Sequence, residues 1–218
     1  TNKIELKSFV APQGREPVLG FVGAGNYASR VLIPAFKEAG AKLDTLLTSG
    51  GVSAVHHGKK NGFVEASTDT KQALGDNTDT VVIATQHNLH AEQAISALEK
   101  GKHVFVEKPL ALTHEEIDAI ESAQKTSNTI VMVGYNRRFA PHIKQMKSLL
   151  DKKTAPKAFI MTMNAGDIPS DHWTQDPAIG GGRIIGEACH YIDLMRFLAG
   201  SKIKSFNAMK MGENNYVD

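Results

Sequence analysis

Residues 18–28 read VLGFVGAGNYA, and this stretch decides the fold. It opens with a short apolar run of the kind that is buried in parallel sheets. Gly23, Gly25 and Ala28 then match the pattern G-x-G-x-x-A. In that pattern the first glycine permits a tight turn, the second lets a pyrophosphate approach the backbone, and the small third residue lets helix and strand pack closely. Between a strand and a helix the pattern predicts a dinucleotide-binding turn, with a purely structural glycine turn as the alternative.

Strands and helices are expected to alternate outward from this turn. The expected strands cover residues 18–22, 41–47, 81–84, 103–106 and 130–133. The expected helices cover residues 28–39, 90–100 and 113–127. Thr113 and Glu116 form a capping-box pattern at the start of the last of these helices. Because strands that alternate with helices form parallel sheets covered on both faces, the sequence predicts a doubly wound α/β domain over residues 18–138.

The segment before this domain has a different character. Residues 1–17 are polar and broken by Pro12, Gly14 and Pro17, so we expect a linker or a frayed tail. The chain opens on Thr1 rather than on an initiator methionine. We therefore expect it to be a piece of a longer protein.

The segment after this domain is expected to be an incomplete second domain, residues 139–218. Its expected helices cover residues 141–150 and 183–198, and its expected strands cover residues 158–163 and 205–211. A sheet of so few strands is marginal on its own. The stretch between them is rich in Gly, Pro and Asp and contains the only tryptophan, Trp173.

Composition narrows the class of ligand. The chain has 25 basic and 23 acidic residues, a net charge of +2, which gives no electrostatic reason to expect a nucleic acid or an anionic membrane as partner. No apolar run approaches the length of a membrane span. The single cysteine, Cys189, excludes an internal disulfide framework and fits a reducing compartment. We expect a cytoplasmic protein that binds small molecules.

Glu107, Lys108 and Pro109 directly follow the strand expected over residues 103–106. They lie at its carboxyl end, where open α/β sheets bind their ligands. A lysine ammonium there can donate a hydrogen bond to a substrate oxygen during hydride transfer, and a cis proline bond would aim that lysine. A plain turn with a solvated lysine is the alternative.

The choice of cofactor depends on the end of the second strand. An acidic residue about 20 positions beyond the glycine pattern would bind the ribose of NAD, but Thr48 and Ser49 stand there. Asp44 is acidic but lies near the other end of that strand. Since a hydroxyl pair tolerates a phosphate better than a carboxylate does, the sequence indicates NAD or NADP and favours NADP.

Five segments together resemble one known family. They are residues 23–28 (GAGNYA), 84–94 (ATQHNLHAEQA), 101–111 (GKHVFVEKPLA), 134–139 (GYNRRF) and 180–194 (GGGRIIGEACHYIDL). In this order they resemble the glucose-fructose oxidoreductase, inositol dehydrogenase and rhizopine catabolism family, Gfo/Idh/MocA. The resemblance implies a Rossmann domain followed by a dihydrodipicolinate-reductase-like α/β domain, often used for homo-oligomer contacts. It also points to a subgroup fused to a zinc-alcohol-dehydrogenase-like region.

The resemblance implies an NAD(P)-dependent oxidoreductase. Hydride would pass between the nicotinamide and a hydroxyl or carbonyl group of a sugar, nucleotide sugar or cyclitol, with Lys108 as catalytic lysine and His190 as acid/base. Two departures stand out: Gly186 replaces the aspartate that many relatives have four residues before the histidine, and residues 85–87 read Thr-Gln-His rather than Thr-Pro-Asn. A non-catalytic dinucleotide sensor and an NAD-dependent glycoside hydrolase are the alternatives.

Glu187 and His190 are three residues apart on an expected helix and therefore share a face. The carboxylate can orient the imidazole and raise its basicity, so Glu187 joins Lys108 and His190 as a catalytic candidate. The same spacing occurs in di-iron bundles, which need two copies; no metal is expected, and a buried core histidine is the other alternative. The predicted cofactor-binding residues are Gly23, Ala24, Gly25, Asn26, Tyr27, Thr48, Ser49, Thr85, Gln86, His87, His90, Glu107 and Lys108. The predicted substrate-binding residues are Lys108, Asn136, Arg137, Trp173, Glu187 and His190.

Overall fold

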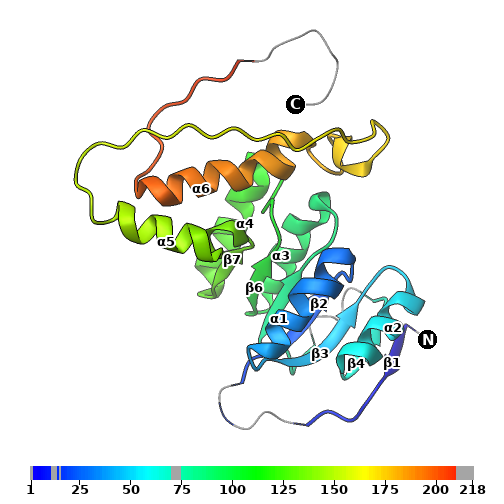
Figure 1. The fold of residues 1–218 in the computed structure, drawn as a ribbon. Helices are drawn as coiled ribbons and strands as arrows, with labels where there is room; N and C mark the ends of the chain where they lie inside the picture. The colour runs from blue at the N-terminus through cyan, green and yellow to red at the C-terminus, as the bar shows by residue number, and fades with distance from the viewer. Residues whose placement is uncertain (1, 11–13, 15, 70–74, 210–218) are drawn as a thin grey trace. The chain divides into compact units, whose positions relative to one another are not determined.

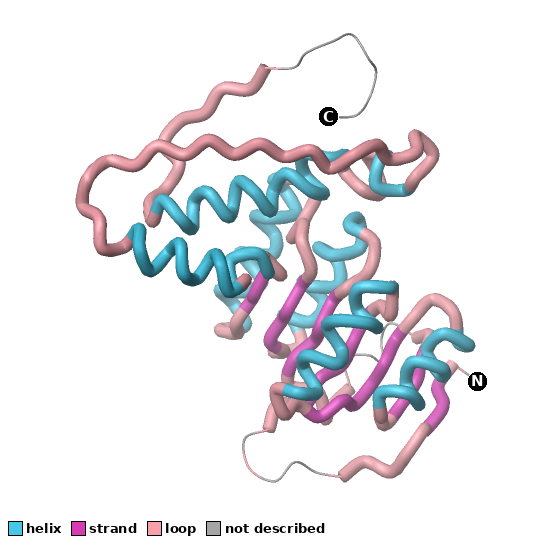
Figure 2. The backbone as a smooth tube through the Cα atoms, viewed as in Figure 1, coloured by secondary structure: helices cyan, strands magenta, loops and turns pink. Residues whose placement is uncertain are grey.

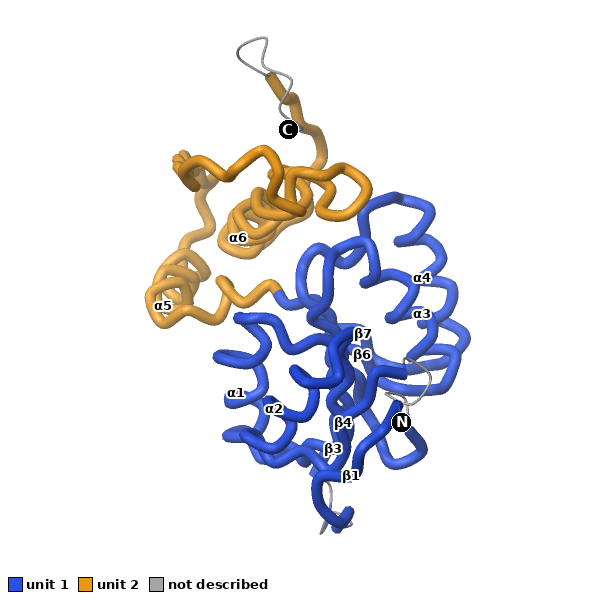
Figure 3. The backbone as a smooth tube through the Cα atoms, turned by 90° about the vertical axis from the view of Figure 1, so that its right-hand side faces the viewer, with its two compact units in different colours: residues 1–134 blue, residues 135–218 orange. Residues whose placement is uncertain are grey.

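The computed structural model describes residues 2–10, 14, 16–69 and 75–209. The chain divides into two compact units, residues 1–134 and residues 135–218 (Figure 3). The first unit therefore ends four residues before the domain boundary expected at residue 138.

A single seven-stranded sheet forms the centre of the first unit (Figure 1). Its strands in spatial order are β1 (Lys3–Glu5), β4 (Glu65–Ser67), β3 (Lys42–Leu47), β2 (Val18–Val22), β5 (Thr80–Ile83), β6 (His103–Val106) and β7 (Val131–Val133). All neighbours pair in parallel except β1, which runs antiparallel to β4. The strand order reverses at the adjacent pair β2 and β5, which is the switch point where such sheets bind ligands.

Helices cover both faces of this sheet. A π-helical turn (Ala28–Leu32) leads into α1 (Ile33–Glu38), and α2 (Gly51–Asn61), α3 (His90–Glu99) and α4 (His114–Ser127) follow. Helices α1 and α2 lie on one face, and α3 and α4 lie on the other (Figure 3). The predicted doubly wound α/β fold with a parallel sheet is confirmed.

The core has one layer on each face of the sheet. On the side of α1, Phe21 contacts Phe36 and Phe63 edge to face, with ring centroids 5.8 and 5.7 Å apart. On the side of α3 and α4, Ile83 and Leu98 belong to a second buried cluster. β-Branched and aromatic side chains suit such strands because they pack well on a pleated surface.

The predicted capping box at α4 is present. The Glu116 N–H donates to Thr113 Oγ1 at 3.2 Å, and Glu116 Oε2 accepts from the N–H groups of Thr113 and Leu112. Asn128 ends this helix in the left-handed region with φ 53°. The sequence pattern therefore located the beginning of this helix correctly.

The expectation of a linker over residues 1–17 is wrong for its first part, because β1 forms there. The β1 backbone pairs Lys3 with Ser67, and the Lys3 ammonium lies 2.6 Å from the Glu65 carboxylate. The Leu6 N–H adds a hydrogen bond of 2.7 Å to the Val64 carbonyl. A free strand edge was available at β4, and pairing with it satisfies backbone groups that would otherwise face solvent.

Helix α2 and strand β4 were not among the predicted elements. Helix α2 contains two glycines and two lysines among its eleven residues, and β4 is only three residues long. Tertiary contacts set their places: α2 packs on the sheet through the buried Ala54, and β4 pairs with β1 and β3 with Ala66 buried. The helix expected over residues 28–39 is also divided, with its first turns widened to π geometry.

The second unit contains two helices and several short turns, and all strands of the described residues lie in the first unit (Figure 2). Its elements are a 3-10 turn (Asn136–Phe139), α5 (Pro141–Leu150), a 3-10 turn (Trp173–Gln175), a π-helical turn (Ile184–Ala188) and α6 (Cys189–Ala199). Gly200 ends α6 in the left-handed conformation, φ 73°.

The strands predicted in the second unit are wrong where the structure describes them. Residues 158–163 and 205–209 are extended but unpaired, and residues 210 and 211 lie outside the described residues. Ile160 is 99% exposed and Phe206 85% exposed. A period-two apolar pattern becomes a strand only beside another strand, and the described part of this unit offers none. Across residues 2–10, 14, 16–69 and 75–209, none of the helices is both long and apolar enough to traverse a bilayer.

Candidate cofactor and catalytic site

Gly23 sits where β2 ends, and only glycine fits there. Its φ is +99°, and a Cβ built on it would lie 2.3 Å from the carbonyl oxygen of Ala84. The Gly23 N–H donates to the Leu47 carbonyl at 2.8 Å. The turn thus ties β2 to the ends of both neighbouring strands, which explains the first glycine of the pattern.

Gly25 differs from Gly23 because its missing side chain faces open space. A Cβ built there meets no atom within 4 Å, and Asn26 and Tyr27 beside it are exposed. The helical segment begins directly afterwards, with the Ser29 N–H donating to the Gly25 carbonyl at 2.9 Å. A pyrophosphate can approach this backbone and the helix start that follows it. The residues present therefore fit a dinucleotide.

The two hydroxyl residues at the end of β3, Thr48 and Ser49, differ in exposure. Thr48 is buried, and its hydroxyl donates to the Gly50 carbonyl at 2.7 Å, whereas Ser49 is exposed. Asp44 lies near the other end of β3, as expected, where burial raises the pKa of its carboxyl and Thr45 and Thr78 donate to it. Ser49 alone remains an open polar side chain for a ribose or a phosphate.

The segment after β5 carries four predicted cofactor-binding residues. Thr85 is half-buried, and its hydroxyl lies 2.8 Å from Gln93 Oε1 of α3; Gln86 is exposed. His87 is buried, with its ring centroid 5.8 Å from that of His90. The His90 ring is completely buried and faces two backbone carbonyls. No part of the His90 side chain is exposed, and its predicted contact with the cofactor stays a prediction.

The turn after β6 contains Glu107, Lys108 and Pro109, and the peptide bond before the proline is cis. The Glu107 N–H donates to the Ile83 carbonyl at 2.9 Å, which fixes the turn at the carboxyl ends of β5 and β6. Lys108 is half-buried. The predicted placement of this turn at the ligand-binding edge of the sheet matches the structure.

The Glu107 carboxyl occupies space that Gly134 leaves free. A Cβ on Gly134 would lie 2.6 Å from Glu107 Oε1. That oxygen is buried and has no hydrogen-bond partner among the described residues, and burial raises the pKa of Glu107 to about 7 although the charge of Lys108 opposes the shift. A buried, unsatisfied oxygen next to Lys108 suits a ligand hydroxyl or amide, because such groups restore the missing hydrogen bond.

In the second unit, His190 lies near the start of α6. It is buried, and the Tyr135 ring meets it edge to face with centroids 6.1 Å apart. Burial, with Cys189 and Asp193 nearby, raises the pKa of Tyr135 to about 12, so its hydroxyl stays protonated. The predicted histidine is therefore held among protein side chains within its own unit.

Glu187 is held by an arginine. Arg137 Nη2 lies 3.1 Å from Glu187 Oε1, and the same guanidinium stacks 4.5 Å from the Tyr191 ring centroid. The guanidinium thus holds the Glu187 carboxylate in place through a charge-assisted hydrogen bond. The sequence placed Arg137 among the substrate contacts but did not pair it with Glu187.

The remaining predicted contacts of this unit lie in short turns. Asn136 starts the 3-10 turn before α5, and Trp173 lies in another, half-buried, with its ring 5.8 Å from that of His172. Arg138, which was not predicted, makes two hydrogen bonds to the Asp193 carboxylate. The spacing of the two Arg residues relative to α6 gave no signal of which acid each would choose.

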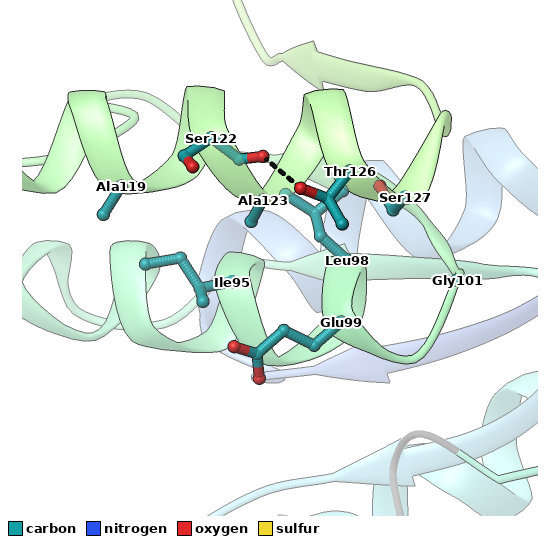
Figure 4. A pocket seen from close by; sticks show the side chains of 9 residues that line it. All are labelled: Ile95, Leu98, Glu99, Gly101, Ala119, Ser122, Ala123, Thr126 and Ser127. Atoms are coloured by element: carbon teal, nitrogen blue, oxygen red, sulfur yellow. Dashed lines mark hydrogen bonds between the residues drawn. The ribbon is translucent and has the colours of Figure 1, made fainter.

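Two cavities of the first unit, of about 540 and 590 Å³, are lined by residues of α3 and α4. One of about 540 Å³ lies between α3 and α4 and is lined by Ile95, Leu98, Glu99, Gly101, Ala119, Ser122, Ala123, Thr126 and Ser127 (Figure 4). Its polar groups are partly engaged, since Thr126 Oγ1 donates to the Ser122 carbonyl at 3.1 Å. None of its lining residues was predicted as a site residue. In the described part of the chain, no three His, Cys, Asp or Glu side chains gather as metal ligands would.

Comparison with known proteins agrees with the fold and the glycine turn. Residues 18–135 match the model of a family described as an oxidoreductase family with an NAD-binding Rossmann fold. Levoglucosan dehydrogenase from Pseudarthrobacter phenanthrenivorans is 30% identical over 192 residues, which are 83% of this chain and 49% of that enzyme. The NAD-dependent scyllo-inositol 2-dehydrogenase from Bacillus subtilis is 32% identical over 88% of this chain and 56% of its own length.

Solved structures give the same picture. Levoglucosan dehydrogenase in complex with NADH and levoglucosan has a TM-score of 0.74 to this chain, at 27% identity, and covers 85% of this chain and 55% of its own. The chain thus spans about half the length of the relatives it matches. The family model covers more than half of this chain, and the chain belongs to the Gfo/Idh/MocA oxidoreductases with an NAD-binding Rossmann fold.

Proposed function

We propose that the protein containing this chain oxidises a hydroxyl group of a sugar, nucleotide sugar or cyclitol, or reduces the corresponding carbonyl, with NAD or NADP. The open backbone at Gly25 carries the proposal, because it leaves room for a pyrophosphate at the switch point of the sheet. Family membership supports it, and so do relatives named for levoglucosan and scyllo-inositol. The bound nicotinamide would supply the hydride acceptor or donor.

Within this proposal each candidate residue has one task. The Lys108 ammonium donates a hydrogen bond to the substrate oxygen and stabilises negative charge on it. His190 takes the hydroxyl proton when the alcohol is oxidised and returns it in the reverse direction. Glu187, held by Arg137, is a positioning residue for the substrate pocket rather than a second base.

For the cofactor, we propose that the exposed Ser49, without an acidic neighbour at Thr48, accepts a 2′-phosphate and so admits NADP as well as NAD. A thermal-shift titration with NAD, NADH, NADP and NADPH tests this, since a ligand that binds the native state raises the melting temperature. A larger rise in melting temperature with NADP and NADPH than with NAD and NADH supports NADP. A shift confined to NAD and NADH refutes it and leaves the dinucleotide site intact.

The catalytic role is tested with Lys108→Ala. Turnover of levoglucosan and scyllo-inositol, followed by nicotinamide absorbance, should fall by about 100-fold or more, whereas the Kd for NADH should stay within about threefold of the wild type. Lys102→Ala is the matched control, because Lys102 precedes the same strand β6 at its other end. Undiminished turnover in Lys108→Ala would refute the assignment.

The same assays distinguish the proposed oxidoreductase from two alternatives, a dinucleotide sensor and an NAD-dependent glycoside hydrolase. Binding of NADH without turnover on any substrate of the panel indicates a dinucleotide sensor, which the replacement of aspartate by Gly186 would suit. Cleavage of a glycoside without net change in nicotinamide absorbance indicates a hydrolase that returns its hydride. The homo-oligomer and the attached zinc-alcohol-dehydrogenase-like region remain part of this proposal, and the native mass of the protein purified from its source tests both.

A further inference from the structure

His90 bridges the two segments that flank the ligand-binding edge. It is the first residue of α3, and its ring is fully buried. Its Nδ1 lies 2.7 Å from the carbonyl oxygen of Pro109, in the turn after β6. Its Nε2 lies 3.2 Å from the carbonyl oxygen of Thr85, in the segment after β5.

Both partners of this ring are acceptors. A carbonyl oxygen accepts hydrogen bonds and donates none, so each contact requires a hydrogen on the ring nitrogen. A neutral imidazole carries only one such hydrogen, and an imidazolium carries two. The protonation of His90 therefore decides whether the ring holds one segment or both.

The surroundings favour the neutral ring. Burial lowers the pKa of His90, and the positive charge of Lys108 lowers it further, although the backbone carbonyls of Pro109, Thr85 and Glu107 oppose this. The other titratable ring beside it is His87. A neutral ring must place its single hydrogen at one of the two carbonyls, and the shorter contact, at Pro109, gains more from it.

We propose that His90 is a positioning residue for the lysine-proline turn: its Nδ1–H holds the Pro109 carbonyl and thereby fixes the direction of the adjacent Lys108. The contact between Nε2 and Thr85 is then dispensable. This inference rests on the proposed function, in which Lys108 polarises the substrate oxygen. Misplacement of a catalytic group by about 1 Å can reduce a rate by about 100-fold, which makes a buried tie of this kind consequential.

Two substitutions separate the two ring nitrogens. In His90→Asn the amide NH2 reaches the position of Nδ1 and can donate to Pro109, whereas in His90→Gln it reaches the position of Nε2 and can donate to Thr85. We expect His90→Asn to keep kcat within about threefold of the wild type, and His90→Gln to lower kcat by about tenfold or more. The KM for the cofactor and the Kd for NADH should change little in either variant, since His90 does not reach the glycine turn.

A second measurement needs no activity. Long-range 15N–1H NMR correlation spectra of the wild-type chain show which nitrogen of each imidazole carries hydrogen, and the His90→Asn spectrum assigns the His90 signals among those of the nine histidines. The Nδ1–H form is expected. An Nε2–H form, or equal kcat values in His90→Asn and His90→Gln, would overturn the inference.

The two hypotheses fail in different ways. A wild-type chain that shows no NADH binding and no turnover contradicts the proposed function, and the NMR spectrum still decides the tautomer. A wild-type chain that turns over normally but holds hydrogen on Nε2 keeps the proposed function and refutes the role of His90.

Discussion

The two units of this chain achieve order by different means. In the first, Phe21, Ile83 and Leu98 are completely buried between the sheet and its helices. In the second, among the described residues, the buried apolar side chains are Leu194 and Leu198 of α6, while Ile160 and Phe206 stand exposed. The side-chain contacts between α6 and the turn before α5 are largely polar, as in the two hydrogen bonds from Arg138 to Asp193.

This difference predicts how each unit responds to change. Burial and close backbone contact depend on shape and respond little to charge screening, whereas ion pairs at a partly exposed surface weaken as screening by salt increases. The first unit should therefore lose stability when a substitution forces a backbone contact apart. The second unit should lose stability when a substitution removes the charge of a paired side chain.

The largest effect is expected at Gly23. In Gly23→Ala the new methyl group clashes with the Ala84 carbonyl at a backbone φ of +99°, which few side chains tolerate. The left-handed conformation costs about 1–2 kcal/mol and the overpacking about 1–3 kcal/mol more. We expect the free energy of unfolding of the first unit to fall by about 4 kcal/mol, as measured by urea denaturation.

Gly25→Ala is the matched control, because a methyl group there meets nothing. Its unfolding free energy should stay within about 0.5 kcal/mol of the wild type. The affinity for NADH should nevertheless fall by about tenfold, since the methyl group enters the space proposed for the pyrophosphate. Equal losses of stability in the two variants would contradict the distinction drawn between the two glycines.

An intermediate effect is expected at Glu107, and it depends on pH. Its pKa rises from 4.5 to about 7 on folding, so between these values the folded chain keeps a proton that the unfolded chain releases. The folded state therefore loses stability as pH rises through this window, and above it the deficit approaches about 3 kcal/mol. Glu107→Gln carries no such charge and should be more stable than the wild type at pH 8 but not at pH 4.

Urea denaturation at pH 4, 6 and 8 measures this difference directly. Glu38→Gln, a substitution on the exposed end of α1, is the control and should leave the dependence on pH close to that of the wild type. A Glu107→Gln variant that gains nothing at pH 8 would show that the carboxylate finds water or a partner in solution.

The success of sequence reasoning follows the same division. The apolar runs over residues 18–22 and 103–106 predicted strands, and the prediction is correct because each run lies beside neighbouring strands of the same sheet. The apolar residues 158–163 carry a similar pattern and remain unpaired. Local pattern identifies a strand only where a partner exists, and the partner is not encoded in the pattern itself.

The site divides similarly. The glycine turn and the turn at Lys108 were predictable because each follows a buried strand, which fixes its place at one edge of the sheet. The complete burial of the His90 ring had no signal in the sequence, which shows order along the chain and not depth. The pairing of Arg137 with Glu187, 50 residues apart, depends on how a turn packs against α6 and has no local signal.

The smallest effect is expected in the second unit, at the pair of Arg138 and Asp193. The Asp193 side chain is 8% exposed and the arginine 32% exposed, so the pair is partly desolvated and bonded twice. Asp193→Asn keeps the shape but removes the charge, which should cost about 2 kcal/mol. Hydrogen exchange in residues 189–199 should then accelerate about thirtyfold, while exchange in β2 and β5 stays unchanged.

Lys125→Gln in α4 removes the exposed partner of Glu121 and serves as the control, with an expected change below about 0.5 kcal/mol because surface pairs contribute little. Raising the salt concentration should narrow the gap between Asp193→Asn and the wild type in residues 189–199, since screening weakens the attraction that the variant lacks. If exchange in β2 and β5 accelerated together with that in α6, the two units would unfold as one. Polar contacts in the second unit would then support the core of the first, and the contrast between burial and charge would no longer separate them.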